Sequence, residues 1–119
     1  MTTTAINDAN FRELYSANDI VVLDFWAVWC GPCQSFKPTY EAVSNKYPDI
    51  VFGTVETEAE QKLSAYFFIR SIPSIVIIRR GLEVFRHPGS LSEEALVNAI
   101  EHVKTLDMDE VEKEHDDAE

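Results

Sequence analysis

The 119-residue chain has little of several features that would place it in a special class. It has two cysteines, too few for a scaffold of structural disulfides, so we expect any disulfide here to be catalytic. Its four glycines and five prolines exclude a low-complexity or collagen-like chain. Basic residues are scarce as well: ten stand against 21 acidic residues. Because nucleic-acid binding requires a basic surface, we expect none.

Long apolar runs are also missing, and we expect no signal peptide. No stretch approaches the roughly 18 apolar residues that span a membrane. The first residues, Met1 to Thr4, lack the basic and apolar regions of a signal peptide. We therefore expect a soluble, cytoplasmic protein without membrane contact. The apolar content of 45% is sufficient for one globular core.

The acidic excess is concentrated at the C-terminus. Residues 107–119 hold eight acidic residues and one lysine, a net charge of −7, which leaves −4 of the total −11 for residues 1–106. We expect residues 1–106 to form one domain and residues 107–119 to be an acidic extension. The extension is expected to be disordered or to prolong the last helix. It either solubilises the protein or selects targets by charge.

Apolar spacing predicts alternating strands and helices. The run from Ile20 to Trp26 is almost continuously apolar, as in a strand buried on both faces, and Asp24 alone interrupts it. The expected strands lie at about 3–6, 20–26, 50–55, 75–78 and 82–86, and the helices at about 7–18, 31–47, 58–67 and 90–103. This order predicts an α/β fold with parallel strands, helices on both faces and a terminal hairpin that makes the five-stranded sheet mixed.

Both cysteines lie in one motif, Trp29-Cys30-Gly31-Pro32-Cys33, between the apolar strand and the helix that follows it. Two thiols at this spacing can close a disulfide within one helical turn, which is a two-electron reaction. The alternative interpretations are two buried free cysteines or half of a metal site. A structural zinc site usually needs four ligands, and the three histidines are not suitably spaced, so no metal is expected.

This motif at the end of a central strand resembles the thioredoxin family over roughly residues 3–106. Four further matches carry the resemblance: the whole segment from Leu23 to Cys33, the helix proline Pro38, the segment from Ile69 to Ser74, and Gly89. The resemblance implies a thioredoxin fold and a thiol-disulfide oxidoreductase that acts as a general protein-disulfide reductase.

The resemblance also assigns roles to the catalytic residues. Cys30, expected at a helix N-terminus and more exposed than Cys33, is the nucleophile, since the helix dipole favours a thiolate. Cys33 resolves the mixed disulfide. Asp24 accepts the proton of Cys33, because burial should raise its pKa; the alternative is a carboxylate that caps a nearby amide. The pair Gly31-Pro32 accompanies reducing behaviour in the family.

The remaining matched residues form the surroundings of the motif. Ile72-Pro73 is expected to be a cis peptide that faces the disulfide, the alternative being a trans proline. Trp29, Ile72, Pro73 and Gly89 are expected to contact targets, and Trp26 to support the motif from behind.

Two departures from the family pattern stand out. Thr54 takes the place of a common lysine, so we expect an even higher pKa for Asp24. Phe68 replaces a common glycine and either fills a pocket or projects as an interaction surface.

The resemblance finally implies partners. We expect a monomer without a bound cofactor, whose redox-active disulfide Cys30–Cys33 is reduced by an NADPH-dependent thioredoxin reductase. Its targets would be disulfide-containing proteins such as peroxiredoxins and reductases. A disulfide isomerase or oxidase, and a non-catalytic binding module on the same fold, remain the alternatives.

Overall fold

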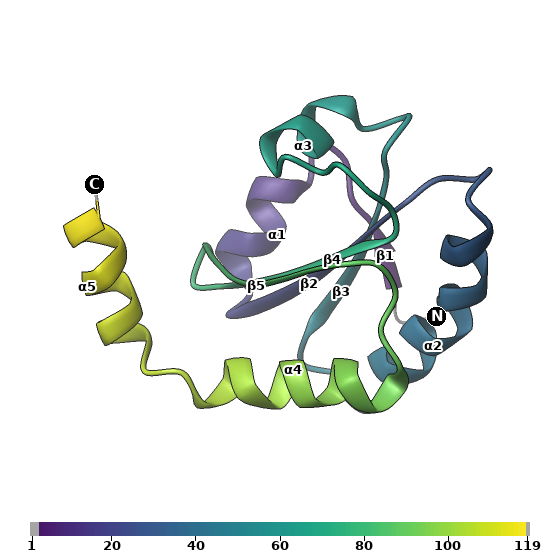
Figure 1. Ribbon diagram of the computed structural model, residues 1–119. Coiled ribbons are helices and arrows are strands. Elements are labelled where there is room, and N and C mark those ends of the chain that lie inside the picture. The colour runs from purple at the N-terminus through teal and green to yellow at the C-terminus, as the bar shows by residue number, and fades with distance from the viewer. Residues whose placement is uncertain (1–2, 119) are drawn as a thin grey trace.

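The computed structural model describes residues 3–118 as one five-stranded sheet with five helices around it (Figure 1). The strands are β1 (Thr3–Ala5), β2 (Ile20–Trp26), β3 (Val51–Glu56), β4 (Ser74–Arg79) and β5 (Leu82–Pro88). The helices are α1 (Phe11–Ala17), α2 (Gly31–Lys46), α3 (Gln61–Tyr66), α4 (Glu93–Thr105) and α5 (Met108–Ala118). None of the helices within residues 3–118 is both long and apolar enough to cross a membrane.

The sheet is mixed, in the order β1-β3-β2-β4-β5. The strands β1, β3 and β2 are parallel, whereas β4 runs antiparallel to both β2 and β5. The alternation of strands and helices had predicted a parallel β4, and this is wrong. The six-residue α3 is about 9 Å long, less than half the length of β3 at about 20 Å. The connection therefore does not return the chain to the other end of the sheet, and β4 starts where β3 ends.

Apolar side chains of β2 alternate between two cores, one on each face of the sheet. Ile20 and Val22 lie in the core beneath α2 and α4, while Val21, Leu23 and Phe25 lie in the core beneath α1 and α3. All five are buried, which confirms the predicted strand with two covered faces. Each such side chain contributes roughly 1.5–3 kcal/mol of hydrophobic stabilisation. Asp24 falls, by the same alternation, on the face covered by α2.

Three helices start later than predicted: α4 begins at Glu93 after the N-cap Ser92, and polar side chains form turns before α1 and α3. The side-chain oxygen of Asn10 accepts the backbone N–H of Asn7 at 2.8 Å, and that of Asn7 accepts the N–H of Asn10 at 2.9 Å, so α1 begins at Phe11. The carboxylate of Glu56 accepts the N–H groups of Glu58 and Ala59, and α3 begins only at Gln61.

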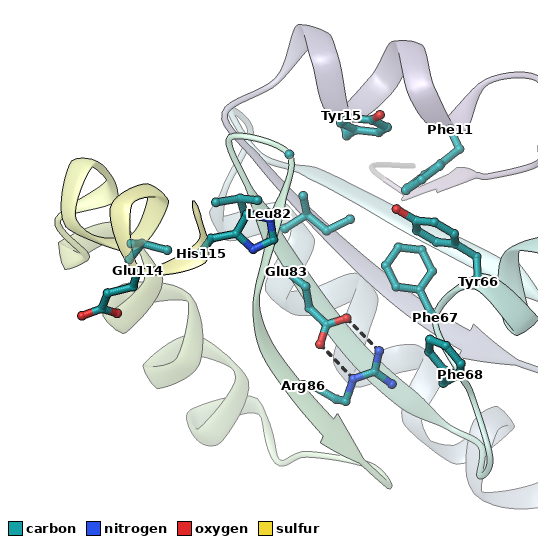
Figure 2. Close-up of a pocket in the computed structure, with 13 residues that line it drawn as sticks. Phe11, Tyr15, Tyr66, Phe67, Phe68, Leu82, Glu83, Arg86, Glu114 and His115 are labelled. Carbon is teal, nitrogen blue, oxygen red and sulfur yellow. Dashed lines mark hydrogen bonds and ion pairs between the residues drawn. The ribbon is translucent and has the colours of Figure 1, made fainter. Parts of the chain in front are cut away.

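The acidic C-terminal segment forms a helix of its own. Leu106, with φ −64° and ψ 138°, is extended and ends α4, and α5 starts at Met108. This differs from the expected disorder or prolonged last helix. Met108 is 2% exposed, so its apolar side chain anchors the start of α5 to the body. Beyond it, α5 stands away from the sheet and leaves a groove facing α1, α3 and β5 (Figure 2).

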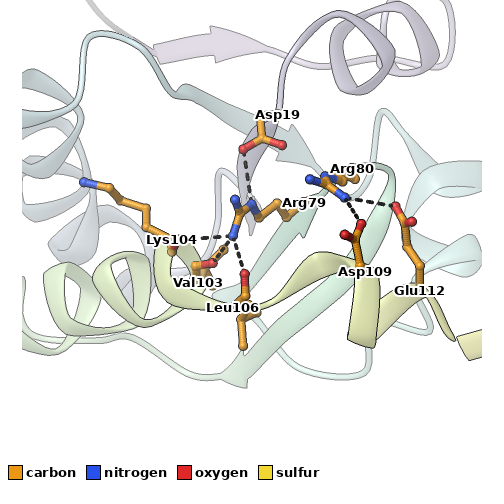
Figure 3. Close-up of polar contacts among 8 residues, drawn as sticks. All are labelled: Asp19, Arg79, Arg80, Val103, Lys104, Leu106, Asp109 and Glu112. Atoms are coloured by element: carbon orange, nitrogen blue, oxygen red, sulfur yellow. Dashed lines mark hydrogen bonds and ion pairs between the residues drawn. The ribbon is translucent and has the colours of Figure 1, made fainter. Parts of the chain in front are cut away.

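Two consecutive arginines at the end of β4 connect this region to the sheet (Figure 3). Arg79 donates to the carbonyl oxygens of Val103, Lys104 and Leu106, at 2.8, 3.3 and 3.2 Å, and to the carboxylate of Asp19 at 3.2 Å. Its guanidinium thus caps the C-terminal end of α4, where helix carbonyls lack partners. Arg80 contacts the carboxylates of Asp109 and Glu112 on α5, at 3.2 and 3.7 Å.

Candidate active site

The two cysteines are disulfide-bonded at the N-terminus of α2. Cys30 is the N-cap residue, with an extended backbone at φ −87° and ψ 110°, and its Sγ accepts the N–H of Cys33 at 3.2 Å. Pro32 occupies the first helical turn, where its missing N–H leaves no hydrogen bond unmade. Free N–H groups and the helix dipole at this end favour negative charge on the Cys30 sulfur.

The loop before β4 packs against the disulfide. The Ile72–Pro73 peptide bond is cis, as predicted, and the carbonyl oxygen of Ile72 lies 3.8 Å from Cys30 Sγ. The N–H of Gly89 donates to the carbonyl oxygen of Pro73 at 2.7 Å. Gly89 has φ +98°, a conformation that favours glycine. The structure therefore places Ile72 against Cys30 and joins Gly89 to Pro73, the next residue after Ile72.

Both cysteines are buried in the disulfide-bonded state. Cys30 is 5% exposed and Cys33 is 3% exposed, so Cys30 is the more exposed of the two, as predicted, but by a small margin. The cover comes from outside the motif, since Ala27, Trp26 and Ile72 pack in one cluster with the cysteines.

The two tryptophans have different surroundings. Trp26 is partly buried against the cysteines, whereas Trp29 is 70% exposed next to Cys30 in the chain. The Trp29 indole Nε1–H donates to the carboxylate of Glu58 at 2.7 Å. Sequence reasoning missed Glu58, since only the fold brings the loop after β3 to this tryptophan.

Asp24 is the one buried carboxylate among residues 3–118. It is 4% exposed, and among the described residues its Oδ1 meets no hydrogen-bond donor. Loss of hydration raises its pKa from 3.8 to about 7. Thr54 is its register partner on β3, which agrees with the predicted position of this departure. Asp24 and Cys33 line one cavity of about 200 Å³.

The lining of the cavity includes a lysine that the sequence did not predict there. Lys37 of α2 lines it, and its Nζ lies 5.8 Å from the centre of the Trp26 ring. Lys37 follows Cys33 by four residues, a spacing that puts both on one helix face. This spacing could have predicted that Lys37 lies on the same side of α2 as Cys33. Lys37 does not overturn the expectation that no cation offsets the Asp24 charge, because the raised pKa of Asp24 is caused by burial and no cation of the described residues lowers it.

Tyr40 forms the inner wall of the cavity. Its hydroxyl lies 2.7 Å from the carbonyl oxygen of Gly53 and 3.1 Å from that of Val22, and so links β2 and β3. Burial, and secondarily the charge of Asp24, raise the pKa of Tyr40 well above its ordinary value. Tyr40 therefore remains a neutral donor while Asp24 titrates. Within residues 3–118 no three His, Cys, Asp or Glu side chains are grouped to hold a metal ion.

Comparisons with known proteins agree with this geometry. The family model described as Thioredoxin matches residues 2–102. The putative thioredoxin 2 of Streptomyces coelicolor is 46% identical over 111 residues, which cover 93% of this chain and 83% of the relative.

Two solved structures have the same fold. A thioredoxin variant from Halobacterium salinarum superimposes with a TM-score of 0.81 at 28% identity and covers 87% of this chain and 92% of its own. The second chain comes from a structure described as the structural basis of the thiol-resolving mechanism in yeast mitochondrial 1-Cys peroxiredoxin via glutathione/thioredoxin systems. It superimposes with a TM-score of 0.78 at 26% identity and covers 85% of this chain and 95% of its own. Together with the disulfide at a helix N-terminus, these matches show that the chain belongs to the thioredoxin family of protein-disulfide oxidoreductases.

Proposed function

We propose that this oxidoreductase works as a general protein-disulfide reductase, with Cys30 as nucleophile and Cys33 as resolving thiol. The observation that carries the proposal is the different setting of the two sulfurs. Cys30 Sγ accepts a backbone N–H at a helix N-terminus, and Cys33 shares a cavity with the proton acceptor Asp24. The Cys30 sulfur is thus placed to be a thiolate, and the Cys33 sulfur to lose its proton later.

The reaction transfers two electrons to the target. The reduced Cys30 thiolate attacks a target disulfide, forms a mixed disulfide and releases the first target thiolate. The Asp24 carboxylate then takes the proton of Cys33. The Cys33 thiolate attacks Cys30 Sγ, which closes Cys30–Cys33 and releases the second target thiolate. A base with a pKa near 7 suits this transfer at neutral pH.

Targets would dock on the surface formed by Trp29, Ile72, Pro73 and Gly89. Trp29 offers an exposed flat ring beside Cys30, and Gly89 and Pro73 are joined by a hydrogen bond. Gly31 and Pro32 start the helix, and Trp26 packs behind the sulfurs. The Gly31-Pro32 pair favours a reductant over an oxidase or isomerase, as the family resemblance implies.

The proposal extends to the partners of the protein and to the roles of the two parts of the chain. An NADPH-dependent thioredoxin reductase in the cytoplasm would return the disulfide to the dithiol, and no bound cofactor would be needed. Target proteins would include peroxiredoxins, the class of protein for which the yeast mitochondrial structural relative is described. Residues 1–106 would act as the catalytic domain of a monomer, with residues 107–119 as an extension.

Reduction of insulin disulfides tests the proposal, with dithiothreitol and, separately, a panel of thioredoxin reductases as electron donors. We expect turnover with both. Cys30→Ser should abolish the first step, whereas Cys33→Ser should accumulate a mixed disulfide visible by mass spectrometry. Failure with dithiothreitol would favour the non-catalytic binding module. Failure with every reductase alone would exclude the proposed recharging step while leaving the chemistry intact.

A further inference from the structure

A groove separates α5 from the opposite wall formed by α1 and α3, with β5 as its floor (Figure 2). We call it the α5 groove. It encloses about 770 Å³, within the roughly 300–1,000 Å³ typical of binding pockets. Its lining is rich in aromatic and aliphatic side chains: Phe11, Tyr15, Tyr66, Phe68, Leu82 and Val111. None of these residues belongs to the active site described above.

Phe68 is the most unusual residue of the groove. Its ring is 75% exposed, and its backbone lies in the left-handed region at φ +54°. A bulky non-glycine residue there costs of the order of 1–3 kcal/mol. The ring therefore projects rather than filling a pocket. Neighbouring Tyr66 is also 69% exposed. Covering an aromatic ring of this kind is worth roughly 1.5–3 kcal/mol, which the free protein does not obtain.

The two acidic edges of α5 have different surroundings. On one edge, Asp109 and Glu112 contact Arg80. On the other edge, carboxylates recur at helical spacing, and none of them makes an ion pair within residues 3–118: Glu110, Glu114 and Asp117. Like charges at such spacing repel one another by a few tenths of a kcal/mol per pair. Glu114 lines the α5 groove, with its carboxylate directed away from the aromatic wall (Figure 2), and by helical spacing Glu110 and Asp117 lie on the same edge of α5; we call this edge the outer rim of the groove.

The inner side of the groove offers little positive charge in compensation. Arg86 is held by Glu83 through two hydrogen bonds, of 2.7 and 2.9 Å, so its charge is matched within the protein (Figure 2). The groove thus combines an aromatic lining with an outer rim of unpaired carboxylates. A complementary ligand therefore carries apolar groups that contact the aromatic lining and positive charge that faces the carboxylates of the rim.

We propose that the α5 groove binds a segment of a partner protein with leucine or aromatic side chains flanked by lysine or arginine. The rim from Glu110 to Asp117 extends about 10 Å along α5, since each helical residue advances about 1.5 Å. The aromatic side chains lie across the groove on α1 and α3. A peptide segment contacts both walls at once, as in the helix-in-groove mode of recognition. The groove is separate from the disulfide, so the inference stands apart from the proposed reductase activity.

The test uses the full chain, labelled with ¹⁵N, and two cysteine-free peptides. Both peptides have leucine and phenylalanine in the middle; one is flanked by lysines and the other by glutamates. We expect the lysine peptide to shift the amide signals of Phe68, Leu82 and Val111. Its dissociation constant should rise at least tenfold between about 0.01 M and about 1 M salt, where the screening length falls from about 30 to about 3 Å. The glutamate peptide should bind at least tenfold more weakly at low salt.

Matched variants make the test specific. Glu114→Lys should weaken the lysine peptide several-fold, whereas Asp49→Lys, the same charge change on an exposed loop outside the groove, should not. Phe68→Gly relieves the left-handed backbone and removes the ring, so it should weaken binding without unfolding the protein. Equal binding of both peptides, or shifts confined to other surfaces, would overturn the proposal. So would concentration-dependent shifts of the groove signals without peptide, which would identify a second copy of this chain as the occupant.

Discussion

Charged side chains near the two ends of β2 differ in how many hydrogen-bond partners they have. Near its C-terminal end, Asp24 is buried with an oxygen that has no hydrogen-bond partner in the described part of the chain. Near its N-terminal end, Arg79 pairs with Ile20 in the sheet, and its guanidinium contacts four oxygen atoms of Asp19 and the α4 terminus.

This difference separates a group that can change its charge from one that cannot. A buried carboxylate without partners is easily neutralised, so its proton is available at neutral pH. A guanidinium bound at several points keeps its charge and holds the chain in place. The disulfide end is thus built for reaction, and the arginine end for the attachment of α4 and α5.

The largest expected effect is the dependence of stability on pH. The pKa of Asp24 is about 7 in the folded state, against 3.8 for a model carboxyl. The folded state therefore binds more protons between these values, and the Asp24 contribution to stability is complete below pH 3.8 and is lost as pH rises to about 7. A pKa shift of this size corresponds to a change of at most about 4 kcal/mol in the free energy of unfolding. Urea unfolding at several pH values measures it.

Asp24→Asn is the control for this pH dependence. The variant should lack the decline through neutral pH and exceed the wild type in stability at pH 8. A variant that retains the decline would show that another group causes it. An Asp24 carboxyl that titrates by NMR near its model value would contradict the raised pKa directly.

The same substitution tests the reaction at this end of the sheet. Without a proton acceptor for Cys33, resolution of the mixed disulfide should slow roughly 10²-fold. The first step, attack by Cys30, should change much less. Rapid-mixing kinetics with a disulfide substrate separates the two steps. In the wild type the second step should accelerate as pH rises through about 7, the pKa of Asp24, and this acceleration should be absent in the variant.

Arg79→Ala tests the other end. It removes the hydrogen bonds to three α4-terminal carbonyls and the ion pair with Asp19. We expect a loss of about 2 kcal/mol, since hydrogen bonds to charged groups contribute about 1.5–3 kcal/mol. The midpoint of urea unfolding should fall while disulfide reduction by the folded protein is unchanged. Arg79→Lys should recover only part of the stability, because an ammonium lacks the planar fork; full recovery would argue against the capping role.

The smallest expected effect concerns Arg80→Ala. This arginine and its partners Asp109 and Glu112 are partly or largely exposed, so global stability should hardly change. The amides of α5 should instead exchange hydrogen several-fold faster, and high salt should produce the same effect in the wild type. Unchanged exchange would mean that Met108 alone holds α5.

Much of the disulfide end was predictable from the sequence. Continuous apolar residues from Ile20 to Trp26 predicted a strand covered on both faces, and the cysteine motif marked the junction to α2. The cis bond before Pro73 followed from the family resemblance. These predictions are confirmed because they depend on local spacing and on short matched motifs.

Other features depend on contacts between distant segments and escaped the sequence reasoning. The direction of β4 depends on the length of α3 relative to the sheet. The hydrogen bond from Trp29 to Glu58 spans 29 residues, and those from Arg79 to the end of α4 span 24 to 27. The cavity shared by Lys37 and Asp24 likewise joins α2 to β2.

The sequence by itself determined where the thiols lie, which strand precedes them and that one carboxylate interrupts that strand, because these properties are local. The tertiary structure decided how far Asp24 is removed from water, how deeply the two cysteines are buried and that the acidic segment becomes a separate helix beside an aromatic groove. The physical reason is that hydration, pairing of charges and packing depend on which residues distant in the chain become neighbours.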